Sequence, residues 1–151
     1  MDKERFMAFP AEIVECLKGC KVENVEFNTD FSDELLQKPI HDYLPAIVSE
    51  LTDNCADKGA KRILITLSDN SVRVEDEVVE PNPEETLKFL NEIKKSGEIV
   101  TTKSKQREGK GRGPGGGMGI SKIVMGYLNR VGGNLDYSII DGRIVAEVTW
   151  S

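Results

Sequence analysis

Apolar and polar positions along the chain switch between a helical period and a strand period, so the pattern predicts both kinds of element. Residues 8–17 have a short amphipathic helix pattern that ends near Gly19, and residues 22–27 alternate as a half-buried strand does. In residues 42–57 the apolar side chains recur at helical spacing, and Gly59 is a typical stop signal. The opening of the chain is therefore predicted to be helix, strand and helix.

The middle of the chain predicts a β-hairpin followed by a helix. Residues 61–67 and 71–76 have strand patterns, and the turn formers at 68–70 join them. Residues 83–95 begin with proline and two glutamates and end in lysines, which suits the capping and the dipole of a helix.

The last third predicts one more helix and a second hairpin. Apolar residues form a helical stripe over residues 120–131, and two glycines at 132–133 close it. Two strand patterns follow at 134–140 and 143–150, and the Asp-Gly pair between them is a strong signal for a two-residue turn.

The order of these elements predicts the fold class. Hairpins require antiparallel pairing, while helices between strands allow crossovers, so the sheet should be mixed and covered by helices on one face. We therefore expect an α/β (α+β) two-layer sandwich. The length of 151 residues suits a single domain over residues 1–151, without an internal repeat or a linker.

Composition narrows the classes of function. The net charge of -6 disfavours non-specific binding to nucleic acid or to an anionic membrane. The sequence contains neither a signal-peptide pattern nor an apolar run of membrane-spanning length, which predicts a cytoplasmic protein. Three cysteines and one histidine do not make a zinc site, so the cysteines are expected to be reduced.

The first candidate site is the glycine-rich run at residues 111–120, which leads into a helix predicted to begin near Met118. Free amides at a helix N-terminus attract phosphate, and glycines let the backbone approach it closely. The spacing matches neither a Walker motif nor a Rossmann fingerprint. A flexible linker is the alternative. The expected anion-binding residues are Gly115, Gly116, Gly117, Met118, Gly119 and Ile120.

The second candidate site lies on the helix predicted at residues 42–57. Glu50, Asn54 and Asp57 are spaced i, i+4 and i+7, so they share a stripe at the margin of the buried face. Glu50 could accept a proton from a nucleophile, and the side-chain oxygen of Asn54 suits Mg²⁺. A polar helix edge without a role is the alternative.

The third candidate is Asp76, at the end of the strand predicted at residues 71–76. A period of two directs its carboxylate to the apolar side, together with Val72 and Val74. A carboxylate on that side needs donors, so it either caps a turn or accepts hydrogen bonds from a ligand.

Taken in order, these motifs resemble the histidine-kinase-like ATPase superfamily, which includes sensor kinase catalytic domains and anti-sigma serine kinases. The resemblance covers about residues 42–150. The sequence from Glu50 to Asp57 resembles the family's N box, and residues 115–120 resemble its second glycine box. The resemblance implies a Bergerat-type fold that binds ATP and Mg²⁺.

The resemblance also implies roles for individual residues. Asn54 would hold Mg²⁺, Glu50 would be the general base, and Asp76 would accept the adenine amino group. The basic segment at about 99–115 would be the ATP lid, from which Lys103 or Arg112 could reach the triphosphate.

One residue departs from the family pattern. The family's first glycine box has Asp-x-Gly, whereas here Val78 follows Asp76 and Glu77. Valine resists the backbone conformations and the close approach that glycine permits. His41 does not match a phosphoacceptor motif, because it precedes the ATP-binding helix itself and Pro45 breaks the motif's spacing.

These observations predict a stand-alone kinase domain that transfers the γ-phosphate of ATP to a partner protein. Because serine or water gains more from an adjacent base than histidine does, Glu50 favours serine transfer or hydrolysis. The alternatives are an ATPase or a nucleotide-gated interaction module, and a binding module with a degenerate, weak ATP pocket. Assembly into a homodimer stays open.

Overall fold

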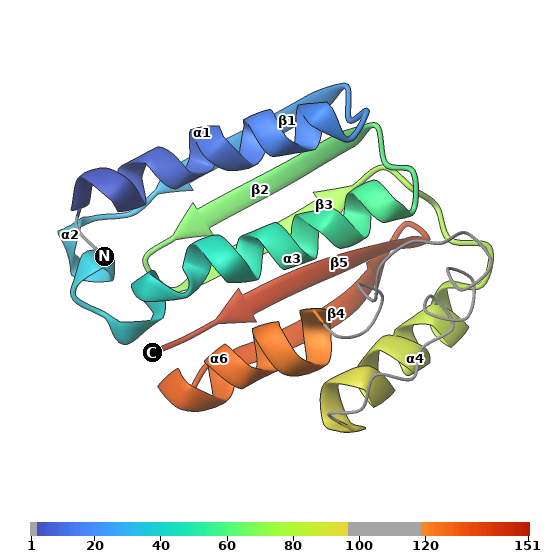
Figure 1. Ribbon diagram of the computed structural model, residues 1–151. Coiled ribbons are helices and arrows are strands. Elements are labelled where there is room, and N and C mark those ends of the chain that lie inside the picture. Colours follow the sequence, from blue (N-terminus) through green and yellow to red (C-terminus); the bar gives the residue numbers. More distant parts are fainter. Residues whose placement is uncertain (1–2, 97–118) are drawn as a thin grey trace.

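A five-stranded mixed sheet organises the computed structural model, which describes residues 3–96 and 119–151 (Figure 1). Its strand order is β1-β2-β3-β5-β4. The strands are β1 (Asn24–Asp30), β2 (Arg62–Ser68), β3 (Ser71–Asp76), β4 (Asn134–Ile140) and β5 (Arg143–Thr149). β1 pairs with β2 in parallel, and the other three pairings are antiparallel. The predicted mixed sheet is confirmed.

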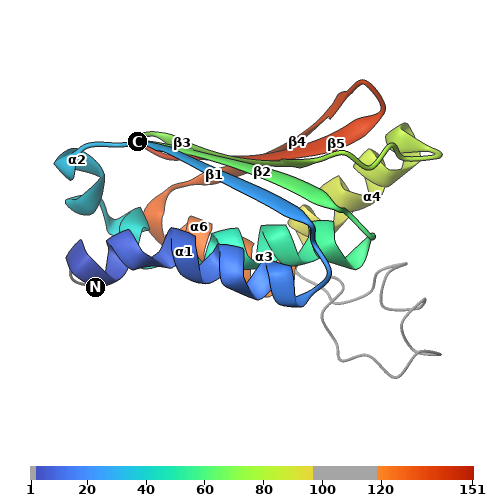
Figure 2. The same cartoon turned by 90° about the horizontal axis from the view of Figure 1, so that it is seen from above.

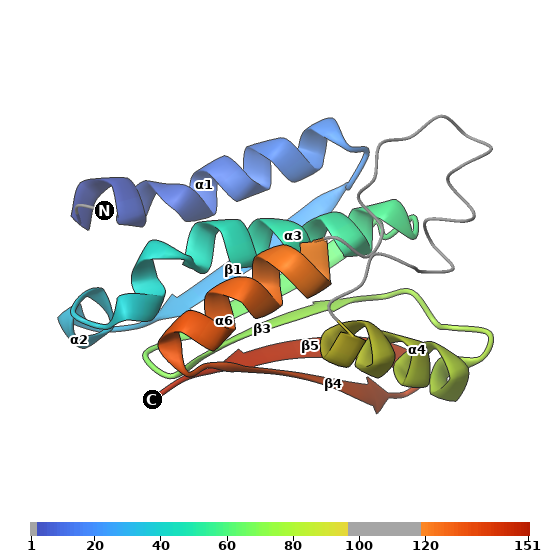
Figure 3. The same ribbon diagram turned by 60° about the horizontal axis from the view of Figure 1, so that its bottom comes forward.

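The helices lie on one face of this sheet, as Figure 2 shows. They are α1 (Lys3–Gly19), α2 (Asp33–Leu36), the 3₁₀ turn η1 (Pro39–Asp42), α3 (Leu44–Asp57), α4 (Pro83–Ser96), the π-helical segment η2 (Gly119–Val124) and α6 (Met125–Val131). α3 lies between α1 and the η2–α6 segment, and α4 lies near β4 and β5 (Figure 3). The predicted two-layer sandwich is therefore confirmed.

The core lies between the two layers because alternate strand residues point toward the helices. Ile63, Ile65 and Leu67 of β2 are buried, and so are Val72 and Val74 of β3. Residues between them on the other face are mostly polar and contact solvent. One carboxylate, that of Asp76, is buried on the apolar side, as the period-two pattern predicts.

The N-terminal quarter differs from the sequence prediction. The first helix begins at Lys3 instead of residue 8 and contains Pro10, and the first strand covers Asn24–Asp30 instead of residues 22–27. The longer helix buries Phe6 and Phe9 in addition to its later apolar positions. The two short elements α2 and η1 were not predicted, because four residues are too few to show a period.

The end of α6 explains two adjacent glycines. Gly132 has a φ of 74°, a left-handed conformation that favours glycine at a helix C-terminus. A Cβ atom on Gly133 would lie 2.7 Å from Cδ2 of Leu128 and 3.2 Å from the carbonyl oxygen of Thr149. The two glycines thus end the helix and let the chain turn closely into β4.

Hydropathy adds one finding about the helices. Among residues 3–96 and 119–151, no helix combines the length and the apolar character needed to cross a membrane.

Candidate functional site

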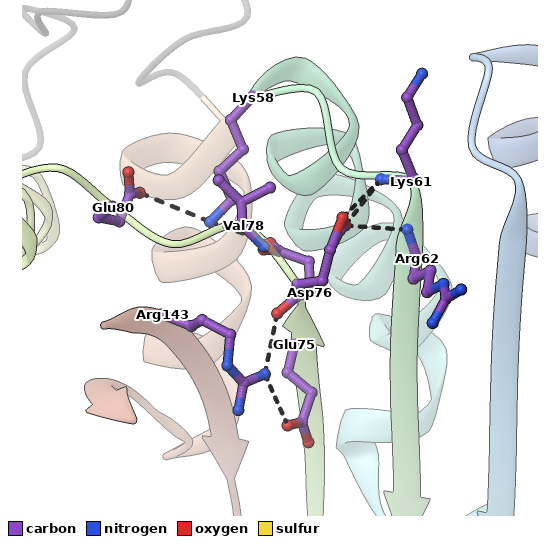
Figure 4. Close-up of polar contacts among 9 residues, drawn as sticks. Lys58, Lys61, Arg62, Glu75, Asp76, Val78, Glu80 and Arg143 are labelled. Carbon is purple, nitrogen blue, oxygen red and sulfur yellow. Dashed lines mark hydrogen bonds and ion pairs between the residues drawn. The ribbon is translucent and has the colours of Figure 1, made fainter. Parts of the chain in front are cut away.

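The candidate site forms where the end of α3 meets the end of β3. Lys58, the residue that caps α3, extends its ammonium group to 3.0 Å from Oδ2 of Asp76 (Figure 4). α3 also contacts both β3 and η2. The structure therefore brings together the N-box-like helix, the buried aspartate and the segment that follows the glycine run.

Asp76 uses its two carboxylate oxygens differently. Oδ1 accepts a hydrogen bond of 2.8 Å from the backbone N–H of Val78, so it caps the turn after β3. Oδ2 is buried, and no hydrogen bond to it forms within the part of the chain that the structure describes. Lys58 is close enough for an ion pair, but the contact lacks hydrogen-bond alignment, so Oδ2 keeps capacity to accept a hydrogen bond.

Lys58 is the cation that faces this carboxylate, and its side chain is 27% exposed. Its ammonium group also lies 3.8 Å from Oε1 of Glu80. A lysine side chain is long and flexible, so its charge can move from Asp76 toward Glu80 and water without unfolding the helix. The ion pair can therefore open for a ligand that offers Asp76 another donor.

Val78 does not strain the turn in which it replaces the expected glycine. Among the described residues, the non-glycine residues with a positive φ are Lys21 and Asp141, so Val78 has an ordinary backbone. Its side chain is half-buried and packs against the core. The expected conformational penalty is absent, and what the substitution adds to this turn is the volume of the valine side chain.

The neighbouring Glu77 fixes the position of β3 against β2. Its carboxylate accepts hydrogen bonds from the backbone N–H groups of Lys61 and Arg62, at distances of 2.8 to 3.0 Å. Partial burial by itself raises the pKa of Glu77, but these backbone donors outweigh it and hold the pKa below its ordinary value. Glu77 thus anchors the strand end that carries Asp76.

The three polar residues of α3 lie where the helical spacing predicts. Glu50, Asn54 and Asp57 are all half-buried, at the border between the apolar face of the helix and solvent. Asn54 precedes the helix end by one turn, and Lys58 follows at i+4. This side of α3 therefore carries an amide and carboxylates toward the same end of the sheet as Asp76.

The glycine run is described only at its C-terminal end. Gly119 and Ile120 begin η2, and the side chain of Ile120 is buried in the core. η2 contacts both α3 and α4. The other residues predicted for phosphate binding lie outside the described residues: Gly115, Gly116, Gly117, Met118, Lys103 and Arg112.

These residues suit a nucleotide with Mg²⁺ in two respects. The free acceptor of buried Asp76 can take a hydrogen bond from an amino group, and the Asn54 side chain offers a hard oxygen ligand. Within residues 3–96 and 119–151, no three His, Cys, Asp or Glu side chains gather as a metal cluster. A magnesium ion that keeps waters and binds substrate phosphates needs only one or two protein ligands.

His41 has a structural environment. Its Nδ1 lies 2.7 Å from the carbonyl oxygen of Lys38, its Nε2 lies 3.3 Å from Asp42, and its ring packs against Phe6. Both ring nitrogens therefore have partners within the fold.

The sequence interpretation did not identify Lys58 or Arg143 as part of this region. Arg143 donates to the backbone carbonyl of Asp76 at 3.1 Å and lies 3.9 Å from Glu75. The contact of Lys58 with Asp76 joins α3 to β3, and no local sequence pattern indicates it. The partner strand of Arg143 was predicted, but its register against β3 was not.

Comparison with solved structures finds histidine kinases. The nucleotide-free catalytic domain of histidine kinase ThkA aligns with a TM-score of 0.55 at 18% identity, over 96% of this chain and 90% of that one. The histidine kinase AdeS of Acinetobacter baumannii aligns with a TM-score of 0.51 at 12% sequence identity. The alignment covers 97% of this chain and 64% of AdeS. The cytoplasmic segment of histidine kinase QseC aligns with a TM-score of 0.50 at 14% sequence identity. The alignment covers 99% of this chain and 74% of that segment.

Sequence comparison finds no matching protein-family model and no matching curated protein. The structural similarity extends over nearly the whole chain, whereas the sequence identity is low. The mixed sheet with helices on one face and the structural similarity therefore identify this chain as having the fold of histidine-kinase catalytic domains, the Bergerat fold.

Proposed function

We propose that this domain binds ATP with Mg²⁺ and transfers the γ-phosphate to a partner protein. The observation that supports this most strongly is the carboxylate of Asp76, which is buried at a strand end and keeps one oxygen able to accept a hydrogen bond. The ammonium group of Lys58, 3.0 Å away, is the charge partner of this oxygen, and a ligand amino group that donates a hydrogen bond to Oδ2 would replace it.

In this proposal Asp76 accepts the exocyclic amino group of adenine. Oδ2 is the available oxygen, because Oδ1 is already bound to Val78. Lys58 turns toward Glu80 when the amino group arrives, and it keeps a counter-charge there. Binding therefore exchanges an ion pair for a hydrogen bond to the ligand.

Asn54 and Glu50 act at the phosphate end. Asn54 contributes an oxygen ligand to Mg²⁺, which when bound neutralises phosphate charge during transfer. Glu50 lies one helical turn before Asn54 and accepts a proton from the attacking hydroxyl group. Since a neutral imidazole needs no such base, the proposal favours a serine of the partner protein over a histidine.

Calorimetric titration tests binding. We expect the wild type to bind ATP more tightly with Mg²⁺ than with a chelator, and Asn54→Ala to lose at least tenfold in the presence of Mg²⁺. Asn28→Ala is the control, because Asn28 is an exposed asparagine on β1. Absence of binding by the wild type at millimolar ATP would refute the proposal.

Transfer is tested with γ-labelled ATP and candidate partner proteins. We expect label on a partner serine, and a rate that falls about 100-fold or more in Glu50→Gln. Asp53→Asn is the matched control, since Asp53 is exposed on the same helix. If free phosphate appears and no protein is labelled, the domain hydrolyses ATP and the proposed transfer is wrong.

The ion pair between Lys58 and Asp76 favours one other function, a nucleotide-gated interaction module with weak affinity. A cation already at the acceptor lowers the net gain from the adenine amino group. In that case ATP would bind without turnover and would change association with a partner or a second copy. Analytical ultracentrifugation with and without ATP distinguishes this from the kinase.

A further inference from the structure

Tyr137 lies on the same inner face of the sheet as Asp76. It pairs directly with Ala146 of β5, and Ala146 pairs with Val74 of β3, two residues before Asp76. With strands about 4.8 Å apart and a rise of about 3.3 Å per residue, the Cα atoms of Tyr137 and Asp76 are about 12 Å apart. On β5, the same-face residues at this level are Ala146, which pairs with Tyr137, and Ile144, which pairs with Ile139.

The hydroxyl group of Tyr137 is buried without a hydrogen-bond partner. None of the residues in the described ranges, 3–96 and 119–151, bonds to its oxygen. Its same-face neighbours along β4 are the apolar residues Leu135 and Ile139. The Lys94 ammonium group of α4 donates a hydrogen bond to the carbonyl oxygen of Leu135 on the same strand.

Two buried polar atoms on this inner face, one from Asp76 and one from Tyr137, form no hydrogen bond within the described residues. Among the described residues, the buried side-chain atoms without a hydrogen bond are Oδ2 of Asp76, the hydroxyl of Tyr137 and Nε of Arg73. Arg73 belongs to the opposite face, and its Nε lies 3.1 Å from a carboxylate oxygen of Glu75. Within the described part of the chain, the buried side-chain atoms on the inner face without a hydrogen bond are thus Oδ2 of Asp76 and the hydroxyl of Tyr137.

The hydroxyl also keeps its proton. Burial raises the pKa of Tyr137, and the Cys55 thiol nearby on α3 adds to this shift. The group is therefore a donor as well as an acceptor at physiological pH. Cys55 is adjacent to Asn54 on α3, so the tyrosine hydroxyl lies on the side of the core toward the candidate site.

We propose that Tyr137 is a second polar anchor for the nucleobase, donating a hydrogen bond to a ring nitrogen of the purine whose amino group Asp76 accepts. This inference rests on the proposed ATP binding and adds a specificity determinant to it. A donor at one edge and an acceptor at the other match 6-aminopurines, because their ring nitrogens accept and their amino group donates. Without a ligand the unpaired hydroxyl costs stability, and a hydrogen bond to the purine offsets that cost, which a phenylalanine of nearly equal shape could not do.

Tyr137→Phe tests the inference because it should lower ATP affinity without lowering thermal stability in the absence of nucleotide. We expect ATP affinity, measured by calorimetry, to fall about five- to tenfold. Thermal stability without nucleotide should stay equal or rise, because the variant removes a buried hydroxyl that has no partner. Tyr43→Phe is the matched control: Tyr43 is half-buried and stacks on Tyr127, and its change should leave ATP affinity unaltered.

Deaza analogues of ATP identify the contact. Among analogues that each lack one ring nitrogen, one should bind wild type and Tyr137→Phe equally, since its contact is already absent. Equal ATP affinity of the two proteins would overturn the inference, and so would a loss of stability without nucleotide, which indicates a structural bond through buried water. If the wild type itself binds no ATP, the proposed function fails together with the inference.

Discussion

The two ends of β3 carry an aspartate each, and the structure treats them differently. Asp69, in the turn before β3, accepts hydrogen bonds from the backbone and the hydroxyl of Ser32 at 2.8 and 2.9 Å. Asp76, at the other end, has one such bond and a movable lysine. A carboxylate whose oxygens are satisfied by its own fold supports structure, whereas one that keeps an open oxygen can bind a ligand.

In the turn before β3, backbone and side-chain groups of Asp69 and Asn70 also have hydrogen-bond partners. The backbone carbonyl of Asp69 accepts from Lys38 and from the indole of Trp150, at 3.2 and 2.7 Å. Lys38 also donates to the Asn70 side chain, and Trp150 donates its backbone N–H to the Asn70 carbonyl. The turn thereby ties Ser32 before α2, Lys38 after it and Trp150 to the sheet.

The largest expected effect is the loss of ATP affinity when Asp76, at the C-terminal end of β3, is changed. Asp76→Asn replaces half of the acceptor with a donor, so it should weaken ATP binding by at least about 30-fold, or about 2 kcal/mol. Unfolding free energy should change less, because the substitution also removes a buried charge. Titration calorimetry and urea unfolding measure both. Unaltered ATP affinity would show that Asp76 does not contact the base.

Lys58→Met removes the cation from the same end. We expect the unfolding free energy to fall by about 1–2 kcal/mol, since the buried carboxylate loses its counter-charge. We expect ATP affinity to rise several-fold, because the adenine amino group no longer competes with the lysine. Lys61→Met is the control, since Lys61 has an exposed side chain near by. A lower ATP affinity in Lys58→Met would mean that Lys58 contacts the nucleotide instead of competing with it.

Asp69→Asn makes the same chemical change in the turn before β3, where the carboxylate accepts hydrogen bonds from Ser32. It weakens the bonds from Ser32, so the unfolding free energy should fall by about 1 kcal/mol, which for a chain of this size lowers Tm by about 2–4 °C. ATP affinity should stay as in the wild type. An effect on affinity as large as that of Asp76→Asn would remove the distinction between the two ends.

Glu77→Gln gives the smallest effect and a pH dependence. Because the pKa of Glu77 is below its ordinary value of 4.5 in the folded state, its charge stabilises the fold above that pH, and the contribution is lost as pH falls through the lowered pKa. Glu77 is exposed, so solvent screening limits the cost to about 0.5 kcal/mol at pH 7. Urea unfolding should show the difference at pH 7, and the difference should disappear in acid once the Glu77 carboxyl group is protonated in the folded state. A difference that persists at low pH would contradict this assignment.

Much of the fold could be predicted because the inner faces have clear periods. β3 and β4 begin and end at the predicted residues, and α3 ends at Asp57 as expected. The first strand extends to Asp30, beyond its apolar alternation, because backbone pairing with β2 holds an edge strand whose outer residues are polar. The first helix begins at Lys3 instead of residue 8 and continues through Pro10.

The candidate site was predictable only in part, because its contacts join elements far apart in the sequence. Period two directed Asp76 inward, and helical spacing put Asn54 at the margin of the core. The position of Lys58 against Asp76 depends on how α3 packs over β3, and the open hydroxyl of Tyr137 depends on the register of β4 against β5. No local pattern contains that information.

Hydrogen exchange with and without ATP and Mg²⁺ compares the two ends of β3 in one experiment. The account predicts added protection of amides at residues 54–60 and 76–80, including the Val78 N–H that binds Asp76, and none at the turn of residues 68–71. Protection confined to that turn, or no change at either end at saturating ATP, would contradict it.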